Sequence, residues 1–213
     1  MNAIIKSEKK HFPVLLNELI NIISPLYGGT FIDCTFGNGG YSQEILKHQS
    51  NKVISIDRDE SVLKIVNKFE AKYKNRFYFK QLKFSQLNKL NLKPTDLKGI
   101  IFDLGYSLNQ IQDKSKGLSF NSDSKLNMRM GLNEFSAHEV INKLEYEDLY
   151  KIIKFFGDEQ KAKFISRKII VKRQSQKINT QDLVKIIDDV KKYRYTKIHN
   201  STKTFQAIRI FVN

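Results

Sequence analysis

The sequence predicts an α/β fold with a doubly wound parallel sheet, followed by a region that contains helices alone. Short apolar runs alternate with segments in which apolar residues have helical spacing, and this alternation is typical of strands joined by helices in a parallel sheet. The predicted strands are residues 30–34, 53–56, 76–83 and 99–104. A length of 213 residues suits one large domain, or a core with a smaller inserted domain.

In the first half of the chain, helices are expected over 13–23, 41–48 and 61–73, where apolar residues recur three and four positions apart. Pro13 stands near the start of the first helix, where proline is well tolerated. Gly28 and Gly29 interrupt the pattern before the first strand.

The second half changes in character after Gly105. Residues 105–133 are polar with little periodicity, and a loop of that length in a compact domain is typically functional or disordered. Ser136 and Glu139 have the spacing of a capping box, which predicts a helix to about Leu144. Further helices are predicted over 145–156, ending at Gly157 as a cap, and over 158–172, 180–190 and 204–213.

These patterns predict three parts. Residues 1–110 form the α/β core, residues 111–195 form a helical insertion, and residues 196–213 return to the core. We also expect the chain to be truncated, because the last helix stops at Asn213 and the late strands of the sheet are missing. Without those strands the strand that contains Ile100 would be an edge of the sheet.

Composition narrows the class of protein. The chain has no run of 18 apolar residues, and we expect neither a membrane span nor a signal peptide. Cys34 is the single cysteine, which excludes an internal disulfide and fits a cytoplasmic location. The net charge of +15 favours a polyanion such as RNA, but 30 of the 37 basic residues are lysine, so biased composition is an equally good explanation.

The segment 33–40 carries the first candidate site, because Asp33 lies at the end of the first predicted strand and glycines follow before a helix begins. Glycines allow a sharp turn and the close approach of a ligand. The segment lacks the Gly-Lys-Ser/Thr of a phosphate-binding loop, and Ser42 occupies the position of the last glycine in the dinucleotide motif. Two interpretations of this segment remain, namely a loop that binds S-adenosylmethionine and a tight turn that binds no ligand.

Two further acids favour the interpretation that this segment binds a ligand. Asp57 and Asp103 end the second and fourth predicted strands, and ligands of open α/β sheets bind beyond the carboxyl ends of strands. Asp57 is placed to accept hydrogen bonds from ribose hydroxyls, whereas Asp59 is interpreted as a helix N-cap.

Seven segments together resemble the RsmH (MraW) family of RNA methyltransferases, in order and over essentially the whole chain. They are 11–16 (HFPVLL), 31–42 (FIDCTFGNGGYS), 56–59 (IDRD), 103–110 (DLGYSLNQ), 116–120 (KGLSF), 126–130 (LNMRM) and 204–213 (TFQAIRIFVN).

The resemblance implies a class I methyltransferase fold with a helical substrate-recognition insertion. It implies S-adenosylmethionine-dependent methylation of the exocyclic N4 of a cytidine in the decoding centre of small-subunit ribosomal RNA, with the small ribosomal subunit as partner and no metal. The implied cofactor contacts are Gly39, Gly40, Tyr41, Asp57, Phe84, Asp103 and Gln110. The implied catalytic residues are Asp103 and Ser107, and the implied substrate residues include Asn127 and Arg129.

Some positions depart from the family pattern. Asn127 replaces an aspartate, which puts the placement of Arg129 in question, and Tyr41 stands where many members have histidine. Cys34 is expected to be buried and inert, so it is not a nucleophile for methylation at cytosine C5.

Residues 161–177 contain seven Lys or Arg and no acid. Lys161, Lys168 and Lys172 are therefore predicted to contact RNA phosphates, with a solvated helix face as the alternative. Phe164 is expected to face the core. At the level of function, the alternatives are a catalytically weak module that binds RNA and the cofactor, and a methyltransferase of DNA or small molecules.

Overall fold

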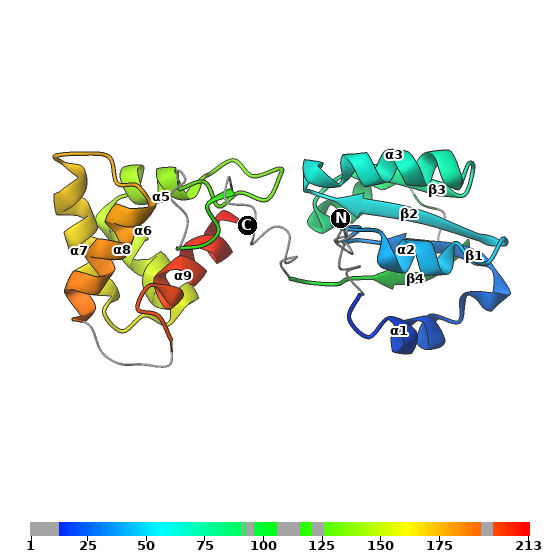
Figure 1. The fold of residues 1–213 in the computed structure, drawn as a ribbon, viewed down its shortest axis with the longest axis horizontal. Coiled ribbons are helices and arrows are strands. Elements are labelled where there is room, and N and C mark those ends of the chain that lie inside the picture. The colour runs from blue at the N-terminus through cyan, green and yellow to red at the C-terminus, as the bar shows by residue number, and fades with distance from the viewer. Residues whose placement is uncertain (1–12, 91, 93–95, 106–115, 121–125, 193–197) are drawn as a thin grey trace, which may run out of the picture. The chain divides into compact units, whose positions relative to one another are not determined.

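A computed structural model of the chain describes residues 13–90, 92, 96–105, 116–120, 126–192 and 198–213 (Figure 1). The chain divides into two compact units, residues 1–105 and residues 106–213. We call them the sheet unit and the helical unit.

The sheet unit is built on four parallel strands in the order β3-β2-β1-β4. The strands are β1 (Gly29–Asp33), β2 (Asn51–Asp57), β3 (Phe77–Gln81) and β4 (Leu97–Ile101). β1 pairs with β2 in continuous register, so that Asp33 lies opposite Ser55. The predicted parallel α/β sheet is therefore confirmed, and β4 lies at one edge of it, with Ile100 41% exposed.

Helices and short turns cover both faces of this sheet. They are α1 (Leu16–Ile23), η1 (Pro25–Tyr27), α2 (Gly40–Ile45), η2 (Glu60–Val62), α3 (Leu63–Lys72) and η3 (Phe84–Leu90). Side chains of α1, α2 and α3 pack with Phe31, Val53 and Phe77 in one apolar cluster. On the opposite face, Ile32 and Ile56 pack with η3. Because both faces are covered, β1 and β2 bury consecutive residues such as Phe31 and Ile32, which is why short apolar runs predicted them.

The helical unit contains five α-helices and one π-helical segment in its described residues. They are α5 (Ala137–Lys143), α6 (Tyr146–Lys151), the π-helical η6 (Ile152–Phe156), α7 (Ala162–Arg173), α8 (Thr180–Lys191) and α9 (Thr202–Val212). The capping box is confirmed: the Ser136 hydroxyl accepts a bond from the Glu139 amide, and the Glu139 carboxylate accepts one from the Ser136 amide.

Gly157 follows η6, as predicted, but its role differs from a left-handed cap. Its backbone is right-handed, with φ −101°. A Cβ atom at this position would lie 2.5 Å from the carbonyl oxygen of Lys203 on α9. Glycine is therefore required by the close approach of two helices rather than by the backbone conformation.

α9 packs within the helical unit, where Phe205, Ala207 and Ile208 are fully buried. The chain thus falls into two units, and the predicted division into 1–110, 111–195 and 196–213 stays a prediction. The longest helices among the described residues, α7 and α8, have 12 residues, and none of the described helices is long and apolar enough to cross a membrane.

Candidate active site

The turn between β1 and α2 is shaped by glycines that packing requires. Gly39 has φ 75°, and a Cβ atom there would lie 2.5 Å from the Phe69 ring. A Cβ atom on Gly40 would collide with Pro13. The backbone therefore lies closer to its neighbours than any other residue type allows, so both glycines have a steric reason apart from any ligand.

Asp33 is fully buried at the carboxyl end of β1. Its carboxylate accepts a hydrogen bond from the Ser42 hydroxyl at 2.6 Å and another from the Thr35 amide at 3.2 Å. The Ser42 hydroxyl also lies 2.8 Å from that of Ser55 on β2. Burial raises the pKa of Asp33 to about 6, an effect that these hydrogen bonds oppose and the charges of Asp57 and Asp103 reinforce. Asp33 holds the turn and is closed to a ligand.

Asp57, at the end of β2, is partly exposed and fixed by the backbone amides of Gly37, Asp59 and Arg58. Its Oδ2 accepts from the Gly37 amide at 2.8 Å, and its Oδ1 accepts from the Asp59 amide at 2.9 Å. Burial raises its pKa, and these hydrogen bonds act against the rise. A carboxylate accepts about four hydrogen bonds, so Asp57 retains acceptor capacity on its accessible side. Asp59 accepts from the Ser61 amide and is the predicted N-cap.

Asp103 follows β4 and is exposed. Its backbone amide donates to the Thr35 hydroxyl at 2.8 Å, which ties it to the same turn. The Tyr41 hydroxyl lies 3.3 Å from Asp103 Oδ2 and donates to the Val14 carbonyl at 2.6 Å. Burial and the charge of Asp103 raise the pKa of Tyr41 to about 12, so this hydroxyl is a neutral donor at pH 7.

Phe84 begins η3 and is 43% exposed. It meets Phe102, which is 47% exposed, edge to face with ring centroids 6.0 Å apart. Phe84 was predicted as a cofactor contact, whereas Phe102 was not singled out from the sequence. The position of Phe102 in the sequence, directly before the candidate acid Asp103, could have indicated that this aromatic residue lies at the site.

In the helical unit, residues 126–130 alternate between the interior and the surface. Leu126, Met128 and Met130 are buried, whereas Asn127 and Arg129 point outward. Asn127 Oδ1 accepts a bond from Arg129 Nε at 2.9 Å. The amide at position 127 therefore still orients Arg129 without the charge of an aspartate.

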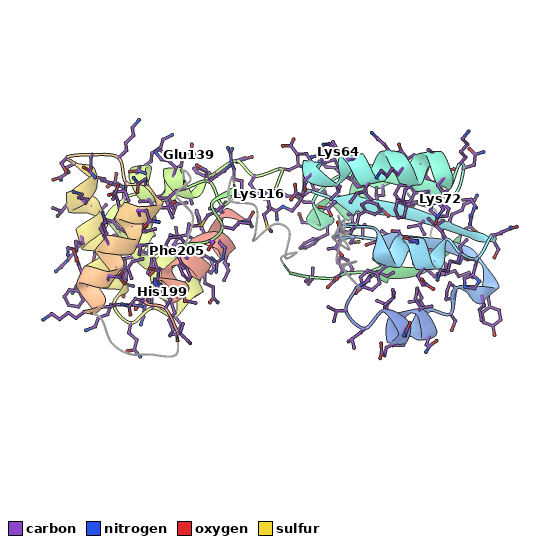
Figure 2. All side chains as sticks on the ribbon, in the orientation of Figure 1. Lys64, Lys72, Lys116, Glu139, His199 and Phe205 are labelled. Carbon is purple, nitrogen blue, oxygen red and sulfur yellow. The ribbon has the colours of Figure 1, made fainter. Side chains whose placement is uncertain are left out.

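The neighbouring segment 116–120 is tied to the same surface of the helical unit. The Met128 amide donates to the Lys116 carbonyl at 2.7 Å. The Phe120 ring stacks on His199 with centroids 4.3 Å apart and meets Phe205 edge to face at 5.9 Å; His199 and Phe205 are labelled in Figure 2. The two predicted motifs therefore form one structural element.

Comparison with known proteins agrees with these motifs. Residues 8–213 match the MraW methylase family. The chain belongs to this family. It is similar to the ribosomal RNA small subunit methyltransferase H of Orientia tsutsugamushi strain Boryong, with 40% identity over 95% of this chain and 67% of the relative. The proteins of the same name from Rickettsia canadensis and Rickettsia bellii strain OSU 85-389 are each 39% identical over 97% of this chain, and over 67% and 68% of their own length.

Membership of the MraW methylase family identifies the sheet unit as a class I methyltransferase fold, and such an enzyme uses a methyl donor. Five of the residues that the family resemblance implies as cofactor contacts lie together around the turn at the carboxyl edge of the sheet. They are Gly39, Gly40, Tyr41, Asp57 and Asp103. Ser107 and Gln110 lie outside the described residues. Among those described, no group of three or more His, Cys, Asp or Glu side chains could hold a metal ion.

Within the basic segment 161–177, some of the cationic side chains are paired inside the helical unit. Lys168 forms an ion pair with Asp189 at 2.7 Å, and Arg173 donates to the carbonyls of Ile141 and Leu144. The prediction that Phe164 faces the core is wrong, since this residue is 55% exposed. It lies on the outer face of α7, where helical geometry also places cations, because the inner face is already filled by Ile165 and Ile169.

We expect the buried Asp33 to make stability fall as the pH rises from about 4 to about 6. Its pKa moves from an unfolded value of 3.8 to about 6, so the folded chain binds a proton more tightly in that interval. Asp33→Asn cannot titrate. Urea unfolding of both proteins across pH 4 to 7 should show the wild type losing up to about 3 kcal/mol relative to the variant, then levelling off. Subtracting the variant removes the other titrating groups, and a difference independent of pH would contradict the assignment.

Proposed function

We propose that the chain transfers a methyl group from S-adenosylmethionine to the N4 amine of a cytidine in small-subunit ribosomal RNA, acting in the cytoplasm on the small ribosomal subunit. The observation that carries the proposal is the convergence of Asp57, Asp103 and the 33–40 turn at the carboxyl edge of a parallel sheet in a member of the MraW methylase family.

The residues present fit this cofactor. Backbone amides hold the Asp57 carboxylate while its accessible side can accept bonds from ribose hydroxyls. The exposed ring of Phe84 offers an apolar surface for adenine. The exposed Asp103 carboxylate supplies a negative charge suited to the ammonium group of the methionine moiety. By resemblance, Gly39, Gly40, Tyr41 and Gln110 complete this set.

The cofactor supplies a reactive methyl sulfonium, so the residues of the chain need to position the amine and accept its protons. The N4 lone pair of cytosine is delocalised into the ring, which makes in-line placement the main requirement. Asp103 is the described candidate acceptor, and Ser107 is the second by resemblance. Methylation at C5 by a cysteine nucleophile is disfavoured, because burial raises the pKa of Cys34 to about 11 and the thiolate is not formed.

We assign RNA contacts to Arg129 and to the outer face of α7. Asn127 engages Arg129 Nε and leaves the terminal nitrogens of the guanidinium to donate to phosphate or base oxygens. On α7, exposed Phe164 and Val171 lie seven residues apart on one helical face. Lys163 and Arg167 flank this face on one side, and Lys168, Lys172 and the N-cap residue Lys161 flank it on the other. Such a surface offers cations for phosphates and an aromatic ring for a base.

Methyl transfer tests the proposal directly. The purified chain is incubated with labelled S-adenosylmethionine and small ribosomal subunits that lack the modification, and the labelled nucleotide is then mapped. Label on N4 of one cytidine supports the proposal. Cofactor and RNA binding without transfer would instead indicate a binding module, and label on DNA or small molecules alone would reject an RNA substrate.

Asp57→Ala is expected to weaken S-adenosylmethionine binding by about 1–3 kcal/mol, because it removes charge-assisted hydrogen bonds to the ribose. Isothermal calorimetry measures the loss. Glu60→Ala, which removes an exposed carboxylate three residues away, is the control and should bind as the wild type does. Unchanged affinity in Asp57→Ala would contradict the role of this carboxylate.

Replacing Lys161 and Lys172 with Ala is expected to reduce the slope of log K against log salt for ribosomal RNA by up to about 2, since each phosphate contact contributes roughly one. Adding Lys168→Ala should lower it less, because Lys168 is already paired with Asp189. The control variant changes Lys64 and Lys72, two exposed lysines of α3 (Figure 2). An equal slope in all proteins would mean that these lysines form a solvated helix face and do not contact RNA phosphates.

A further inference from the structure

The side chain of Asn213, directly after α9, makes four hydrogen bonds to described residues. Its Nδ2 donates to the Met128 carbonyl at 2.7 Å and to the Arg209 carbonyl at 3.0 Å. Its Oδ1 accepts from the Met130 amide at 2.9 Å and from Asn133 Nδ2 at 2.6 Å. A carboxamide has two N–H donors and two lone pairs on oxygen, so the hydrogen-bonding capacity of Asn213 is fully used.

Two of these bonds flank Arg129. Met128 and Met130 are its neighbours in the chain, and Asn213 binds the carbonyl of one and the amide of the other. The side chain thus pairs with this segment as a neighbouring strand would. Met128 itself adopts φ 56°, an uncommon value for a residue other than glycine, and its side chain is fully buried. The conformation that turns Arg129 outward therefore depends on bonds from outside the segment.

A second contact from α9 holds the adjoining segment. Arg209 donates to the carbonyl of Leu118 at 2.8 Å, and the Met128 amide binds the carbonyl of Lys116. Arg209 lies in the last turn of α9 and Asn213 is its C-cap, four residues later, so the two side chains lie on the same side of this helix end. Together they attach both segments of the loop to one helix.

We propose that Asn213 is a positioning residue for RNA recognition: by clamping the backbone on both sides of Arg129, it holds the guanidinium in its binding orientation. This role rests on the proposed function. It requires asparagine specifically. An aspartate of the same shape could still accept from Met130 and Asn133, but it could not donate to the carbonyls of Met128 and Arg209 and would repel them.

The test compares Asn213→Asp, Arg129→Ala and the double variant in the full chain. Affinity for unmodified small-subunit ribosomal RNA is measured by filter binding, and S-adenosylmethionine affinity by calorimetry. We expect Asn213→Asp to raise the RNA Kd about tenfold, comparable with Arg129→Ala, and to add little in the double variant, because both changes remove the same contact. Cofactor affinity should not change, since the cofactor residues of the sheet unit are untouched.

Asn142→Asp is the matched control. The Asn142 amide donates to the carbonyls of His138 and Ile178, so the substitution removes two equivalent bonds of the helical unit without touching the Met128–Met130 backbone. It should lower stability by a similar amount and leave the RNA Kd unchanged. Asn213→Ser, which releases the clamp without a buried charge, serves if the aspartate variant does not fold. Hydrogen exchange at the Met130 amide should accelerate in the Asn213 variants and not in the control.

The outcomes separate the two proposals. RNA binding that is the same in the wild type and in the Asn213 variants overturns the positioning role alone. Losses that add fully in the double variant also overturn it, because they place Asn213 outside the Arg129 contact. A wild-type chain that binds no ribosomal RNA would reject the proposed function, and the positioning role with it.

Discussion

The sheet unit depends on a buried carboxylate. Placing the Asp33 side chain away from water is costly unless hydrogen bonds satisfy it, and the Thr35 amide and the Ser42 hydroxyl do so. These bonds fix the turn after β1. This turn also positions the other two acids, because the Gly37 amide donates to the Asp57 carboxylate and the Thr35 hydroxyl accepts from the Asp103 amide. Three acids from three strands are therefore connected through one short segment of backbone.

The three acids have similar positions in the sequence, each at or just after the end of a strand, but they differ in their exposure and in their role. Asp33 is closed to solvent and its pKa is raised to about 6 by burial, whereas Asp57 and Asp103 reach the surface. The structural carboxylate of Asp33 thus lies beside two carboxylates, those of Asp57 and Asp103, that are accessible to a cationic cofactor. Ser42 explains the departure from the dinucleotide motif, because a glycine in its place would leave Asp33 without its shortest hydrogen bond.

In the helical unit, buried backbone groups are satisfied by one cationic and one neutral side chain, those of Arg209 and Asn213. Its loop has to expose Asn127 and Arg129 while burying the residues between and beside them. Polar backbone buried in this way needs partners, and Arg209 of α9 and the C-cap Asn213 supply them. The final motif of the chain, at 204–213, therefore combines core residues such as Phe205 with side chains that shape a distant loop.

The sequence determined the parallel α/β sheet, the capping box at Ser136, the N-cap at Asp59 and the family, because these follow from local periodicity, short-range spacing and ordered motifs. Sequence also located the candidate acids, since the carboxyl ends of parallel strands share one edge. It did not predict that Phe164 is exposed or that Gly157 serves helix contact. Nor did it predict that Asn213 clamps Met128 and Met130. Tertiary structure alone decided these features, because each depends on contacts between residues from distant parts of the chain or on which side of a helix is already filled, and neither is encoded in local spacing.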